Sequence, residues 1–139
     1  MNKRDLMMKR NDVARLFEMS SRRHRNCIRI NTNNSFQHEF SKFVICWKLA
    51  KQGKEFLTEA ILEGRKNIAD IVCLDDGEVI EVLHTETPDR FEAKLETIPE
   101  ALEVISYYTN EVIGEIVDEI MEWERNERSR KSNPDNNKE

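Results

Sequence analysis

Two carboxylates interrupt the most apolar stretch of the chain, residues 67–88, which reads NIADIVCLDDGEVIEVLHTETP. Val, Ile, Leu and Cys on either side of Asp76-Gly77 predict a β-hairpin. A two-residue turn places Asp70 and Glu81 on one sheet face as diagonal neighbours about 7 Å apart. A three-residue loop shifts the register by one and sends them to opposite faces. On a shared face the two carboxylates suit one hard cation, because such cations prefer oxygen ligands.

Length and composition set the broad class. The chain has 139 residues, of which 38% are apolar and 35% charged. These values are typical of a single soluble domain. No apolar run approaches the roughly 20 residues that span a bilayer, and the first residues lack a signal-peptide core. We therefore expect a cytoplasmic protein with no membrane contact. Its three cysteines form no CxxC pair, which favours reduced thiols over a disulfide or a zinc site.

Charge is divided unevenly along the chain. Residues 1–34 carry nine Lys or Arg against three acids, a balance of +6 that leaves −11 for the remainder of a chain of net charge −5. A basic segment suggests a nucleic-acid partner, and DNA is the partner we expect. Residues 12–30 resemble the first two helices of a helix-turn-helix module, with Arg22, Arg23 and Arg25 facing DNA. Alternatively, Leu16 and Phe17 pack on the domain or on a second subunit, or the segment is a solvated basic arm.

The remaining pattern predicts an α/β (α+β) domain with a mixed central sheet, flanked by helices in the order αβββαβ. Ser35 caps the first helix of this core, whose apolar residues recur at helical spacing. Pro88 begins the second helix and Pro99 ends it. The expected elements are a helix at 35–51, strands at 55–62, 67–75 and 78–85, a helix at 88–97, a strand at 102–106, a closing helix at 109–127 and a disordered tail at 128–139.

A helix carrying Glu39, followed by paired strands carrying Asp70 and Glu81, resembles the PD-(D/E)XK nuclease superfamily. The resemblance covers residues 35–106, and small archaeal Holliday junction resolvases are members of similar length. It implies a restriction-endonuclease-like fold in which Glu39, Asp70 and Glu81 hold Mg²⁺, with Mn²⁺ as an alternative. It also implies hydrolysis of DNA, in which the metal supplies the attacking hydroxide and neutralises transition-state charge.

The chain departs from this pattern at Leu83, where the superfamily has a lysine that orients or activates the attacking water. Lys94 on the following helix, or less favourably Lys42 or Lys66, replaces it; otherwise the site cuts slowly or has lost catalysis. Arg65 and Lys66 stand at the hairpin mouth, where they could meet a phosphate. A bulge near Thr85 could bring His84 or Glu86 to the metal.

Four functions are compatible with these patterns. The first, and the one we expect, is Mg²⁺-dependent DNA cleavage, with metal ligands Glu39, Asp70 and Glu81 and with Lys94 as the substitute lysine. The second is a DNA-binding protein that keeps the nuclease fold without cutting. The third is a regulator that reads DNA through residues 12–30, and the fourth is a structural or interaction domain. The domains are a basic arm at 1–34, a nuclease-like domain at 35–127 and a tail at 128–139; the closing helix, with Trp123, could pair two subunits into a homodimer.

Overall fold

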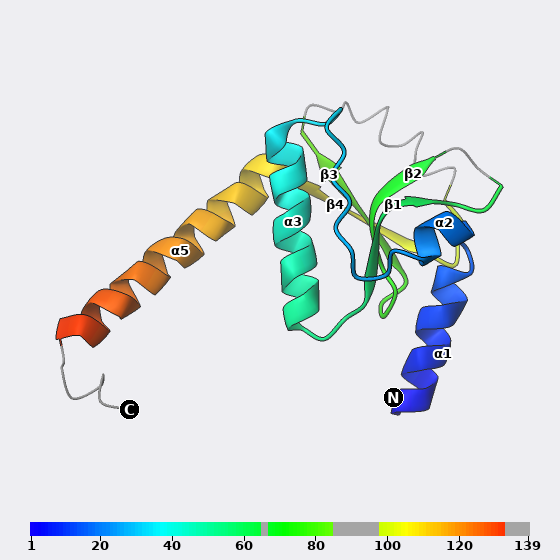
Figure 1. Cartoon of the computed structure of the whole chain (residues 1–139), viewed down its shortest axis with the longest axis horizontal. Helices are drawn as coiled ribbons and strands as arrows, with labels where there is room; N and C mark the ends of the chain where they lie inside the picture. The colour runs from blue at the N-terminus through cyan, green and yellow to red at the C-terminus, as the bar shows by residue number, and fades with distance from the viewer. Residues whose placement is uncertain (65–66, 85–97, 133–139) are drawn as a thin grey trace.

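The computed structural model describes residues 1–64, 67–84 and 98–132, and its centre is a four-stranded mixed sheet (Figure 1). The strands are β1 (Phe56–Ile61), β2 (Ile68–Cys73), β3 (Glu78–Leu83) and β4 (Glu103–Tyr108), in the spatial order β1-β2-β3-β4. β1, β2 and β3 pair antiparallel, and β4 is parallel to β3. The predicted α+β class with a mixed sheet is therefore confirmed.

Helices lie on both faces of this sheet. α3 (Phe36–Lys51) begins where the sequence predicts, because Ser35 caps it: the Ser35 Oγ accepts a hydrogen bond of 3.1 Å from the backbone N–H of His38. Buried side chains of α3 pack with Ile71, Cys73, Ile80 and Val82 on one face. α5 (Thr109–Ser132) contributes Val112 to this layer and then projects away from the domain (Figure 1).

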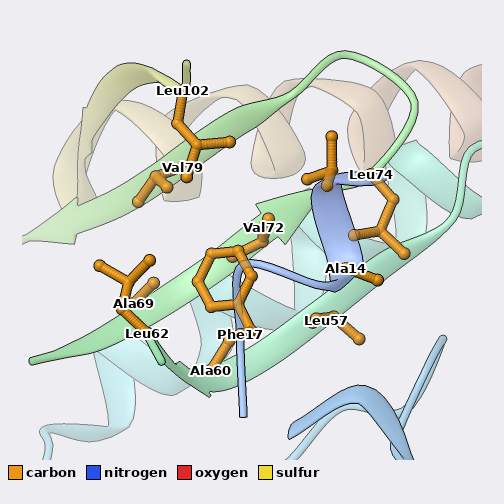
Figure 2. Packing of buried hydrophobic residues seen from close by; sticks show 11 residues of the cluster. Ala14, Phe17, Leu57, Ala60, Leu62, Ala69, Val72, Leu74, Val79 and Leu102 are labelled. Atoms are coloured by element: carbon orange, nitrogen blue, oxygen red, sulfur yellow. The ribbon is translucent and has the colours of Figure 1, made fainter. Parts of the chain in front are cut away.

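The opposite face is covered by the N-terminal segment, which comprises α1 (Lys3–Ala14) and the single turn α2 (Met19–Arg22). Figure 2 shows Phe17 among Ala60, Ala69 and Val72 of the sheet, and its side chain is fully buried. Burying a phenylalanine contributes about 1.5–3 kcal/mol. Phe17 therefore anchors the N-terminal segment to the domain.

The expected helix-turn-helix does not form. α2 has only four residues, too few for a recognition helix, which must lie along the major groove. Its Ser21 is buried, and the Ser21 Oγ accepts a hydrogen bond of 2.9 Å from the backbone N–H of Ile61. The backbone N–H of Glu18 donates to the Ile61 carbonyl at 2.8 Å. Residues 1–34 therefore do not form a free arm, and the alternative in which Leu16 and Phe17 pack on the domain is the one observed.

The hairpin has a longer turn than the two residues predicted. Ile71 lies opposite Ile80 and Cys73 opposite Glu78, so residues 74–77 form a four-residue loop. In this loop Leu74 is fully buried and its backbone N–H donates to the Glu55 carbonyl at 2.8 Å, while Gly77 adopts a φ of 66°, which favours glycine. The register moves by two residues rather than one, and a two-residue shift does not by itself change the face of a side chain.

Other boundaries differ from the prediction at the C-terminal end. The strand expected at 102–106 is observed as β4, Glu103–Tyr108. α5 continues to Ser132, so residues 128–132 are helical where a disordered tail was expected; an ion pair of 3.1 Å between Arg130 and Glu127 supports this last part.

The predicted helix at 88–97 and residues 133–139 lie outside the described residues. No helix within the described ranges is both long enough and apolar enough to cross a bilayer.

Candidate functional site

Three acidic residues lie at one level across the sheet. Thr58 pairs with Ile71 and Ala60 with Ala69, which places Glu59 of β1 opposite Asp70 of β2. The pairing of Ile71 with Ile80, continued by one residue, brings Asp70 opposite Glu81 of β3. Glu81 in turn lies opposite Ser106 of β4. The sheet therefore carries a row of carboxylates on three adjacent strands.

A break in the strand alternation turns two of these acids toward α3. Leu57 and Ala60 of β1 both pack under the N-terminal segment although they are three residues apart, and Ala69 and Val72 of β2 do the same. A regular strand would put such residues on opposite faces. Glu59 has a φ of 48°, a left-handed conformation that costs about 1–3 kcal/mol for a residue other than glycine. The candidate site therefore includes a strained backbone conformation at Glu59.

α3 supplies the partners of these acids through His38, Glu39 and Lys42. The Lys42 Nζ lies 2.9 Å from Glu59 Oε1 and 2.7 Å from Glu39 Oε1. The other oxygen of Glu39 lies 2.8 Å from His38 Nδ1, and His38 Nε2 lies 3.3 Å from Asp70 Oδ2. A continuous polar network therefore links β1 to β2 through the helix.

Lys42 is the most enclosed charge in this network, with a side-chain exposure of 0%. Its ammonium group donates to the Arg29 carbonyl at 2.6 Å as well as to Glu39 and Glu59, which uses all three N–H groups. Burial alone would lower the pKa of Lys42, but the hydrogen bonds to the two carboxylates outweigh burial and raise it. Lys42 therefore stays protonated and has no donor left for a water or a substrate.

The carboxylate of Glu39 also accepts hydrogen bonds from several neighbours. Besides Lys42 and His38, the backbone N–H of Asn31 donates to it at 2.5 Å. Burial tends to raise the pKa of Glu39, but these three donors, led by Lys42, lower it. Within the described residues, no three His, Cys, Asp or Glu side chains are grouped so as to hold a metal ion. The structure thus connects Glu39 to Asp70 through His38, and it does not gather Glu39, Asp70 and Glu81 around one point.

Asp70 and Glu81 form the most buried acidic pair, with exposures of 9% and 3%. The backbone N–H of Val82 donates to Asp70 Oδ2 at 2.8 Å. Burial raises the pKa of Asp70, but hydrogen bonds from His38, Glu81 and Val82 together lower it. Two carboxyl groups this close rarely ionise together, and a proton shared between them would satisfy both.

His38 was not recognised as a site residue in the sequence, although it lies four residues before Lys42 on the same helix face. Burial lowers the pKa of His38, whereas hydrogen bonds to Asp70 and Glu39 raise it, with a net increase. A doubly protonated imidazole can donate to both carboxylates at once, while the neutral ring can donate to only one. When both ring nitrogens are protonated, His38 can therefore bridge the two acids.

A small cavity adjoins Glu81. It has a volume of about 60 Å³, and its other lining residues are Asn67 and apolar side chains that include Ala69, Val79 and Ile98. Since a water molecule occupies about 30 Å³ in the liquid, the cavity has room for about two waters. Glu81 is therefore buried but lies next to a cavity that is large enough for water.

The predicted phosphate contacts lie away from this row of acids or outside the described residues. Arg25 forms an ion pair of 3.0 Å with Glu55, just before β1, and Arg23 contacts the sulfur of Met19 at 3.7 Å. Arg22 is half-buried on α2. Arg65, Lys66, Glu86 and Lys94 lie outside the described residues.

Leu83 is the last residue of β3, and His84 follows it. Leu83, the position at which the nuclease resemblance expects a lysine, is buried at the end of β3. The His84 Nδ1 lies 2.8 Å from the hydroxyl oxygen of Thr109, at the start of α5. His84 therefore contacts the closing helix.

Comparisons with protein-family models, curated proteins and solved structures found no match to this chain. The function of this protein is therefore inferred from the geometry of the site.

Proposed function

We propose that this protein hydrolyses DNA phosphodiester bonds with a divalent metal ion held by Asp70 and Glu81. One observation carries this proposal: the two buried carboxyl groups lie opposite each other on adjacent strands, and Glu81 lines a small cavity. Such a pair is costly to bury without a cation or a shared proton. A metal ion in place of a shared proton would be coordinated by both carboxylates.

The order of the elements supports the same proposal. One helix, α3, is followed by three antiparallel strands and by a fourth strand parallel to the third. In the described residues this order is compatible with the αβββαβ core of the PD-(D/E)XK superfamily, whose second helix would fall on residues 88–97 outside them; in that superfamily the helix glutamate and two strand acids surround the reaction centre. In the proposed fold Glu39, Asp70 and Glu81 take these three positions.

Mg²⁺ fits the two strand carboxylates. It is usually bound by one or two carboxylates and keeps several waters, and the adjoining cavity holds about two waters. When bound, the metal would polarise the phosphate and lower the pKa of a coordinated water. Mn²⁺ would bind the same oxygens.

The other polar residues position this pair. His38 and the Val82 N–H both donate to Asp70 Oδ2, which fixes the direction of the carboxylate. Glu39 orients the imidazole of His38, and Lys42 orients Glu39. Partners of this kind commonly set the orientation and basicity of a metal ligand. In this proposal Glu39 acts on the metal through His38 and Asp70, and its own oxygens stay bound to nitrogen donors.

The missing lysine remains the main difference from an active nuclease. Lys42 cannot replace it, because its three N–H groups are taken by Arg29, Glu39 and Glu59. Lys94 stays the proposed substitute. DNA would be held by cations of the N-terminal segment, whose balance is +6, and by Arg65 and Lys66.

The test is a cleavage assay on labelled single-stranded, duplex and branched DNA with Mg²⁺ or Mn²⁺. Asp70→Asn keeps the size of the side chain and removes a charged ligand, and we expect it to slow cleavage by at least about 100-fold. Asp118→Asn, the same change at an exposed position of α5, is the matched control and should cut as the wild type does. Cleavage by the wild type that Asp70→Asn leaves unchanged would refute the assigned site.

A second candidate is a DNA-binding protein that no longer cuts. Two observations favour it: Leu83, where the resemblance expects a lysine, is buried, and His38 contacts Asp70 without a metal. Under this alternative the wild type shifts labelled DNA in a gel and leaves it intact after long incubation with either metal.

A further inference from the structure

α5 extends beyond the domain with apolar side chains exposed. Its first turns are held by Val112 in the core and by ion pairs of 3.1 and 3.2 Å from Lys48 to Glu115 and Glu119. Further along, the helix leaves the domain (Figure 1). The exposed fractions there are 46% for Val117, 50% for Ile120, 56% for Met121 and 63% for Trp123.

This exposed stripe continues into a groove between α5 and α3. The groove has a volume of about 360 Å³, and apolar side chains dominate its lining. Within the described residues nothing lies over it. An exposed apolar surface of this extent usually marks an interaction site. We call it the apolar groove: Phe40, Phe43, Trp47, Ile116, Ile120 and Trp123.

The charges of α5 are divided between its two halves. Residues 109–124 contain six acids and no Lys or Arg, whereas residues 125–132 contain four Lys or Arg and one acid. The helix dipole favours this order only within the first and last turns. Acids such as Asp118 and Glu122, in the middle of the helix, are not explained by the dipole. A second helix in the opposite direction would pair the acidic half of each with the basic end of the other.

We propose that α5 pairs with α5 of a second copy of this chain, antiparallel about a two-fold axis near Ile120 to Trp123. An interface of this kind uses the same surface on both copies, so it closes as a dimer. The helix beyond Val117 is about 24 Å long and about 10 Å wide, which is a face of only about 240 Å². Stable interfaces bury about 800 Å² per partner. The second α5 therefore also covers the apolar groove on α3.

This inference is independent of whether the protein cuts DNA. The first experiment is sedimentation equilibrium of the full chain, in which the wild type should be a dimer. Ile120→Glu and Trp123→Glu each place a charge in the interface, and we expect them to raise the dimer dissociation constant at least about 100-fold. Ile30→Glu is the matched control, because Ile30 is exposed outside α5 and the groove. A monomeric wild type, or a dimer unaffected by both variants, overturns the proposal.

Helix direction is tested by charge exchange and by crosslinking. Arg125→Glu with Arg128→Glu should weaken the dimer, and adding Asp118→Arg with Glu122→Arg should restore it. In a Cys27→Ser background, Glu122→Cys near the axis should form a disulfide with its own copy on oxidation. Arg128→Cys, further from the axis, should crosslink much less. Equal crosslinking at both positions indicates parallel helices and overturns the antiparallel arrangement.

Discussion

Replacing Lys42 by methionine tests the polar network most sharply. The substitution keeps the length of the side chain and removes an ammonium group that is completely enclosed. Glu39 keeps hydrogen bonds from His38 and Asn31, but Glu59, whose side chain is 13% exposed, loses its ion pair with Lys42. Removing one partner of a buried ion pair costs about 3–5 kcal/mol.

For a domain of this size the loss corresponds to a fall in melting temperature of about 9–15 °C, at about 3 °C per kcal/mol. Chemical denaturation followed by circular dichroism gives the free energy of unfolding directly. Lys48→Met is the matched control on the same helix: Lys48 also contacts two carboxylates, but its side chain is 34% exposed, so we expect a loss of at most about 1 kcal/mol.

A double-mutant cycle with Glu59→Gln separates the ion pair from other effects. In the wild type Glu59→Gln should destabilise the fold, whereas in the Lys42→Met background it should cost less, because the amide removes a buried charge that has lost its partner. The expected coupling is about 1–3 kcal/mol. Lys42→Met within about 1 kcal/mol of the wild type, or a coupling near zero, would refute the enclosed ion pair described here.

Three further changes test separate parts of the structure. The folded pKa of His38 is raised above its unfolded value of 6.5. Its contribution to stability is therefore complete below pH 6.5 and is lost as the pH rises through the folded pKa. His38→Gln should remove this pH dependence from denaturation curves measured across that range. Phe17→Ala should cost about 3–5 kcal/mol of unfolding free energy and make the N-terminal segment accessible to proteases; resistance equal to that of the wild type would contradict its role as an anchor. Ser35→Ala should cost about 1 kcal/mol through loss of the helix cap, while Ser35→Asp should restore it.

Regular elements were predictable because local signals and burial agree in them. Ser35 and the apolar spacing that follows it fixed the start of α3, and alternation of apolar residues located β1 and β3. The hairpin turn was harder, since Asp76-Gly77 favours a two-residue turn locally, but burial of Leu74 in the tertiary core gives a four-residue loop. Tertiary packing also decides the N-terminal segment, where Phe17 binds the sheet and the helix-turn-helix pattern does not form.

The acidic pair could be found in the sequence because unpaired carboxylates are unusual in apolar strands. Asp70 and Glu81 are indeed adjacent and buried. The role of His38 and Lys42 could not be read in the same way, because a helical His and Lys are usually exposed. Lys42 contacts Glu59, which has a left-handed φ, and His38 contacts Glu39 and Asp70. The left-handed conformation of Glu59 has no local sequence signal.

The central claim is that Asp70 and Glu81 together bind a divalent metal ion, and calorimetric titration of the full chain with Mn²⁺ tests it most directly. We predict one site per chain, with binding that weakens as the pH falls, because carboxyl groups must be deprotonated to bind the metal. Asp70→Asn and Glu81→Gln should each abolish this binding, whereas Asp118→Asn should leave it unchanged. Binding that persists in both site variants, or its absence from the wild type, would contradict the account.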